Sequence, residues 1–181
     1  MDILEFRDTA EWEAWLDTNH ADRAEAWLRI AKRHSGLPLI RIADALDGAL
    51  SFGWIDGQRR AYDDDSFLQR YSRRRKTSSW SKVNVEKVAA LSAAGRMRPA
   101  GVAEVAAAKA DGRWDSAYES QRTAQVPADL AAALSENPTA RAVFDSLGRS
   151  ERYAVFLPLL KARTPESRAR VLTREVARLT A

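Results

Sequence analysis

The sequence predicts an α+β fold, with a small antiparallel sheet and helices in the N-terminal half and helices alone in the C-terminal half. Three observations predict it. Segments that read as strands occur only before about residue 75. From Asn84 onwards, apolar residues recur at helical spacing between breaks at Gly, Pro and Asn. The chain has 181 residues, of which 45% are hydrophobic and 30% charged, so it can bury a core.

The N-terminal half is expected to begin with a helix, a strand and a second helix. Asp8 to Glu11 has the spacing of a capping box, which predicts a helix that continues through Leu16. The short apolar run at 26–30 is followed by a polar segment and predicts a strand; the alternative is a short helix. An amphipathic helix is expected to follow Pro38.

Segments 52–62 and 66–73 predict a β-hairpin, with three aspartates at 63–65 as the turn. Gly53 and Gly57 lie within or beside the first of these strands. Glycine in a strand indicates a bulge or a close approach of another backbone.

The C-terminal half reads as a series of short helices separated by breaks. Helix starts are expected at Asn84 as an N-cap, at Pro99, Pro127, Asn137-Pro138, Ser150 and Thr164-Pro165. Pro158 should kink or split its helix, because it lacks an N–H donor. We expect two domains, an α+β domain over 1–120 that contains the basic segment and a helical tail domain over 121–181.

Composition excludes several classes of protein. Without cysteine there are no disulfides, thiol nucleophiles or thiolate metal sites. No run approaches the roughly 20 apolar residues that a membrane span needs. The N-terminus lacks the basic and apolar regions of a signal peptide, so a cytoplasmic location is expected.

The strongest functional signal is a concentration of positive charge. The net charge of +4 is modest, but 69–82 holds six basic residues and no acidic residue. Guanidinium forks, hydroxyl donors and a helix start each suit an anion. The candidate anion-binding residues are Arg70, Arg73, Arg74, Arg75, Ser79, Trp80, Ser81, Lys82 and Asn84. The alternative is a solvated connection in which Ser79, Ser81 and Asn84 cap the helix and Trp80 joins the core.

Other reactive residues give weaker signals. Asp56 lies beside two arginines and could be a polar partner or general base, or a carboxylate satisfied by the backbone or an arginine. His20 and His34 lack metal-ligand spacing, and no catalytic residue, metal site or cofactor is expected. Trp12, Trp15, Trp27 and Trp54 are expected to form one aromatic core cluster; the alternative is an aromatic ligand pocket.

Two motifs carry a family resemblance. Phe52-Gly53-Trp54-Ile55-Asp56-Gly57 and Ser79-Trp80-Ser81-Lys82 resemble the YdeI/OmpD-associated, bacteriocin-protection-like family. The resemblance extends over nearly the whole chain, and 126–168 resembles the family's helical tail domain. It implies an intracellular protein linked to resistance against bacteriocins or cationic antimicrobial peptides, with neither agreed catalytic residues nor a cofactor.

Three functions therefore remain open. The first is a non-enzymatic binding or stress-protection protein that uses the basic segment. The second is a small enzyme for an anionic substrate, with Asp56 near Ser79 or Ser81. The third is nucleic-acid binding, which would depend strongly on salt. The expected partners are thus an anionic small molecule, another protein or a nucleic acid, and no membrane span is expected.

Overall fold

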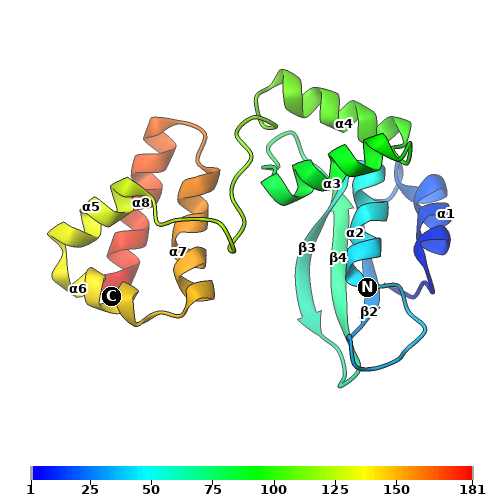
Figure 1. Cartoon of the computed structure of the whole chain (residues 1–181), viewed down its shortest axis with the longest axis horizontal. Coiled ribbons are helices and arrows are strands. Elements are labelled where there is room, and N and C mark those ends of the chain that lie inside the picture. Colours follow the sequence, from blue (N-terminus) through cyan, green and yellow to red (C-terminus); the bar gives the residue numbers. More distant parts are fainter. Residues whose placement is uncertain (1, 181) are drawn as a thin grey trace. The chain divides into compact units, whose positions relative to one another are not determined.

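The computed structural model describes residues 2–180 (Figure 1), and the fold is α+β. The chain forms two compact units. The first unit extends to Ser78 and resumes from Asn84 to Asp115, and the second comprises Ser79–Val83 and the chain from Ser116 onwards. The domain boundary expected near residue 120 remains a prediction.

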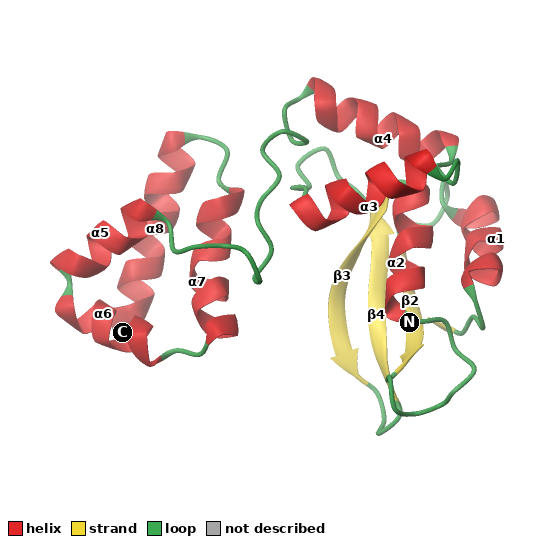
Figure 2. Cartoon of the chain, viewed as in Figure 1, coloured by secondary structure: helices red, strands yellow, loops and turns green. Residues whose placement is uncertain are grey.

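Among the described residues, strands occur only in the first unit, and the second unit is helical (Figure 2). No strand follows Arg73 within residues 2–180, as the sequence predicts. The first eight elements along the chain are β1 (Ile3–Leu4), α1 (Thr9–Asn19), β2 (Glu25–Ala31), α2 (Ile42–Ser51), β3 (Trp54–Ala61), β4 (Ser66–Arg73), α3 (Lys82–Ala93) and α4 (Pro99–Ala110).

The sheet has the strand order β1-β2-β4-β3. β4 pairs antiparallel with both β2 and β3, which confirms the hairpin, but the short β1 pairs parallel with β2. The sheet is therefore antiparallel except at one edge, where β1 runs parallel to β2. The register between β3 and β4 shifts between Asp56 and Arg59, so Gly57 lies at an irregularity in this edge strand.

One face of the sheet carries the core of the first unit. Trp12 of α1 and Ala49 of α2 pack there against Leu28, Trp54 and Tyr71. Trp15 is partly buried against this cluster.

The prediction that Trp27 joins the aromatic cluster is wrong. Trp27 is buried, but it lies on the opposite face, under the guanidinium of Arg60 at 4.4 Å from the ring centroid. Successive residues of a strand point to opposite faces, so Trp27 and its core neighbour Leu28 cannot share one.

The prediction that Asn84 is an N-cap is also wrong. α3 begins at Lys82, so Asn84 lies inside its first turn and is buried. The first N–H groups of a helix need acceptors outside the helix. Lys82 N donates to Tyr118 O at 2.9 Å, and this contact between residues distant in sequence allows the helix to begin at Lys82, three residues before Val85.

The helical elements of the second unit are α5 (Ala128–Glu136), α6 (Pro138–Ser146), α7 (Arg149–Lys161) and α8 (Pro165–Thr180). Asn137 caps α6 as predicted, accepting from Ala140 N at 3.1 Å. Pro158 does not split α7, which continues to Lys161. The four helices enclose a core that includes Leu130, Phe144 and Leu159.

No helix within residues 2–180 has the length and apolar character needed to cross a bilayer.

Candidate functional site

The basic segment starts in β4, where Arg70 is held by a carboxylate. Arg70 Nε donates to Glu25 Oε2 at 2.8 Å, across the β2–β4 pair. This bond is the main reason that the pKa of Glu25 lies below its usual value. The charge of Arg70 is therefore largely balanced within the protein.

Three exposed cations follow, and they differ from Arg70. Arg73, Arg75 and Lys76 are exposed, and no carboxylate among residues 2–180 forms an ion pair with them. Arg73 Nη1 donates to the carbonyl of Ala21 at 2.9 Å, which positions its guanidinium. A turn closes beyond Arg75, because Arg75 N donates to Ser78 Oγ and Ser78 N donates to Arg75 O. We call Arg73, Arg75 and Lys76 the cation cluster.

Three other residues of the predicted site are buried. Arg74, Trp80 and Asn84 have exposed fractions of 9%, 1% and 7%. With its ring enclosed, Trp80 has no face on which a base could stack. Its position matches the alternative in which this indole joins the core.

The far end of the segment belongs to the second unit. Lys82 forms an ion pair with Glu119, and this bond lowers the pKa of Glu119. Ser79 and Ser81 are partly buried there. A single surface formed by all nine candidate residues remains a prediction.

Asp56 is an exposed carboxylate on the edge strand β3. Its register partner on β4 is Tyr71, whose pKa is raised by burial first and by the charge of Asp56 second. Asp56 belongs to the first unit, and Ser79 and Ser81 belong to the second. Its pairing with those serines in an active site remains a prediction.

His20 ends α1 as a structural residue. Its Nδ1 lies 2.8 Å from Leu16 O, and its ring packs against Phe52 at 5.2 Å between centroids. No group of three or more metal-ligating side chains occurs within the described part of the chain.

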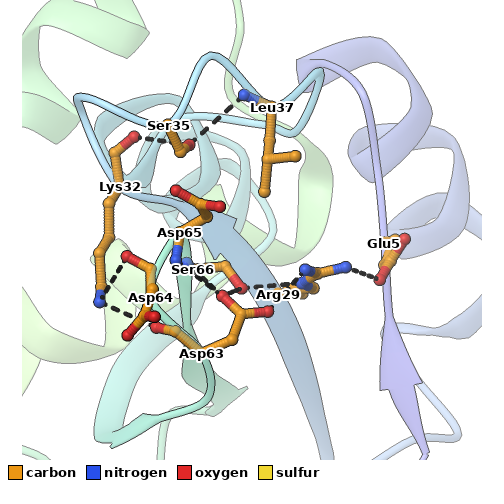
Figure 3. Close-up of polar contacts among 9 residues, drawn as sticks. All are labelled: Glu5, Arg29, Lys32, Ser35, Leu37, Asp63, Asp64, Asp65 and Ser66. Atoms are coloured by element: carbon orange, nitrogen blue, oxygen red, sulfur yellow. Dashed lines mark hydrogen bonds and ion pairs between the residues drawn. The ribbon is translucent and has the colours of Figure 1, made fainter.

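A polar network that the sequence did not indicate lies at the turn of the hairpin (Figure 3). Arg29 donates to Ser66 Oγ at 2.8 Å and forms ion pairs with Glu5 at 3.0 Å and Asp63 at 2.7 Å. Asp63 Oδ1 also accepts from Ser66 N and Oγ, and these bonds lower the pKa of Asp63.

Lys32 extends this network by donating to the carbonyls of Asp63 and Asp64 (Figure 3). Arg29 is balanced by two carboxylates and Lys32 is bonded to two backbone carbonyls, so the network holds the turn against β2. Glu5, Arg29 and Asp63 are far apart in sequence, so no local motif could have indicated this cluster.

Two family models match the chain. Residues 4–104 match the family described as Domain of unknown function (DUF8412), and the chain belongs to that family. Residues 123–181 match the model described as Bacteriocin-protection, YdeI or OmpD-Associated, which confirms the family suspected from the sequence motifs.

The bacteriocin-protection match covers the helices α5 to α8, whereas both motifs that carried the resemblance lie within the other match. No curated protein and no solved structure matches the chain.

Proposed function

We propose that this protein is a cytoplasmic, non-enzymatic stress-protection protein that binds an anionic ligand through the cation cluster. The observation that carries the proposal is that Arg73, Arg75 and Lys76 are exposed and lack carboxylate partners among the described residues. The bacteriocin-protection match at 123–181 supports the protective role.

The chemistry of the cluster favours an oxyanion. Two guanidiniums offer planar forks that match phosphate or carboxylate groups, and Lys76 adds a compact charge. Thr77 is exposed beside them and brings a hydroxyl donor. A cationic peptide is a poor direct ligand, because like charges repel. Protection would therefore act through an anionic ligand or partner.

The test compares two variants of equal net charge. The triple variant Arg73→Gln, Arg75→Gln, Lys76→Gln removes the cluster. The control Arg33→Gln, Arg41→Gln, Arg170→Gln removes three exposed cations from other elements. Pyrophosphate and a short single-stranded oligonucleotide are titrated by calorimetry at two salt concentrations.

We expect the cluster variant to bind pyrophosphate at least tenfold more weakly than the control, since it loses several charge-assisted hydrogen bonds. Tight oligonucleotide binding with a steep loss in salt would identify nucleic acid as the ligand. Equal binding by both variants, or no binding by the wild type, would refute an anion site at the cluster.

The protective role has its own test. Cells that produce the wild-type protein should survive a bacteriocin better than cells that produce the cluster variant, at equal protein levels. Equal survival would show that protection does not depend on anion binding by the cation cluster.

A further inference from the structure

The second unit contains a small cavity on the first two turns of α7. Its volume is about 210 Å³. Segment 121–126 forms the other wall. The cavity shares no residue with the cation cluster.

The floor of the cavity belongs to one helix face, which carries two arginines and two aromatic side chains. Arg149, Arg152, Tyr153 and Phe156 follow one another at helical spacing, so they share a side of α7. Phe156 is 4% exposed and packs edge-on against Tyr153, with 5.4 Å between ring centroids. Ala124 and Val126 complete the apolar lining.

Side-chain hydrogen bonds hold the wall against the helix. Tyr153 Oη donates to Glu119 O at 2.8 Å, and Arg149 Nη2 donates to Arg122 O at 2.6 Å. Gln121 Nε2 donates to Ser150 Oγ at 2.7 Å. These bonds connect the start of the cavity wall, from Glu119 to Arg122, to α7, so this part of the site needs little ordering to bind a ligand.

The lining is positively charged. It includes Arg149 and Arg152 and no acidic residue. Arg152 is oriented by bonds from Nε and Nη2 to the carbonyls of Phe144 and Asp145. The remaining N–H groups of both guanidiniums have no acceptor among residues 2–180.

The acidic side chains nearest in sequence to Arg149 and Arg152 already bond to other groups. Asp145 pairs with Arg141 at 3.3 Å. Glu151 accepts from Gly148 N at 2.8 Å in the cap of α7. Neither carboxylate is therefore available to neutralise Arg149 and Arg152.

We infer that this cavity binds a small carboxylate with a flat apolar body, of about the size of benzoate. The carboxylate would accept from the guanidiniums of Arg149 and Arg152, which match its two oxygens. The apolar body would cover Phe156, Ala124 and Val126 and remove them from water. The cavity is smaller than most drug-sized ligand sites, which restricts the ligand to one ring or a short chain.

The experiment titrates the whole chain with sodium benzoate at constant ionic strength and follows backbone amide signals by NMR. Benzamide, which has the same ring without the charge, and inorganic phosphate, which has charge without the ring, serve as comparison probes. We expect benzoate to shift signals around Ala124, Arg149 and Phe156 and to bind more tightly than either comparison probe.

Two variants and one control make the test specific. Arg149→Gln removes the charge while keeping a polar side chain, and should weaken benzoate binding at least tenfold. Val126→Trp should fill the cavity and abolish the shifts. Arg170→Gln removes an exposed charge from α8 and should bind like the wild type.

Three results would each overturn the inference. The first is the absence of shifts around the cavity at the highest soluble benzoate concentration. The second is equal binding of benzoate and benzamide. The third is unchanged binding by Arg149→Gln. None of these results bears on the cation cluster, so this site and the proposed function fail independently.

Discussion

At the scale of single residues, the indole of Trp12 shows how the first unit is stabilised. Its side chain is fully buried, and Nε1 donates to Ala45 O at 3.0 Å. It stacks on Trp15 at 5.3 Å between ring centroids and meets Trp54 edge-on at 6.4 Å. The ring thus contributes buried apolar area, aromatic contacts and a satisfied donor at one position.

Replacing Trp12 with Ala should lower the free energy of unfolding by ~3–5 kcal/mol, because a large cavity would remain in the core. Urea denaturation of the two proteins measures this loss. Val102→Ala is the matched control, since Val102 is 54% exposed and should change stability little. A loss below ~1 kcal/mol for Trp12→Ala would be inconsistent with a buried indole.

At the scale of elements, contacts between helices depend on small residues and on ion pairs. α4 passes close to the end of α2, where Arg98 N donates to Ser51 O at 3.0 Å. Gly101 makes this approach feasible, because a Cβ at that position would lie 2.1 Å from Ser51 O. In the second unit, Asp129 of α5 pairs with Arg168 of α8 through both carboxylate oxygens.

Gly101→Ala should destabilise the protein by about 1–3 kcal/mol, the usual scale for overpacking. The sign of this stability change is informative, because replacing Gly with Ala in a helix interior normally stabilises a protein by about 1 kcal/mol. Thermal or urea denaturation measures the change. Ala103→Gly is the control, because position 103 is an exposed position of the same helix. It measures how much Ala and Gly differ in helix propensity there, without the clash. A stabilised Gly101→Ala variant would contradict the close approach of α4 to Ser51.

Asp129→Asn should lower stability near pH 7 by about 0.5–1 kcal/mol, a small effect because both partners are about one-third exposed. The hydrogen bond from Arg168 lowers the pKa of Asp129 in the folded state. The contribution of the Asp129–Arg168 pair to the free energy of unfolding is therefore complete above the ordinary aspartate pKa of about 3.9. It is lost as the pH falls through the lower pKa that Asp129 has in the folded state.

Urea denaturation of wild type and Asp129→Asn at several pH values tests this dependence. The stability difference should shrink towards acid pH. Asp145→Asn is the control, because the Arg141–Asp145 pair is more exposed and should contribute less. A difference independent of pH would show that the charge of Asp129 is not the source of the stabilisation.

At the scale of the whole molecule, the chain has two separate hydrophobic cores. One is formed around Trp12, Leu28 and Tyr71, and the other around Leu130, Phe144 and Leu159. Each core lies within one compact unit. Residues 79–83 belong to the second unit although they lie in the sequence between two stretches of the first.

Leu159→Ala should accelerate amide hydrogen exchange in α5 to α8 and leave exchange in β2 and β4 unchanged. The substitution should cost ~2–5 kcal/mol within the second core, because Leu159 is fully buried there. Native-state hydrogen exchange measures both regions in one experiment. Equal acceleration in both units would indicate that they unfold as one cooperative structure.

Much of the fold was predictable because its signals are local. The N-cap at Asp8, the cap at Asn137 and the aspartate turn of the hairpin each lie within a few residues, and the structure confirms all three. The reciprocal half of the capping box differs, because Glu11 accepts from Arg7 N. Prediction of the site was less complete. The sequence indicates the positive charge of 70–82, but it does not indicate that Glu25 pairs with Arg70 or that Glu119 pairs with Lys82.

The sequence by itself determined the α+β class, the order of most elements and the concentration of cations over 69–82, because these follow from short-range periodicity, capping and composition. The tertiary structure alone decided which of those cations keep an unbalanced charge, where α3 begins and where the cavity of the second unit lies. Each depends on groups that are distant in the chain and meet only after folding: Glu25 with Arg70, Tyr118 with Lys82, and Arg122 with Arg149.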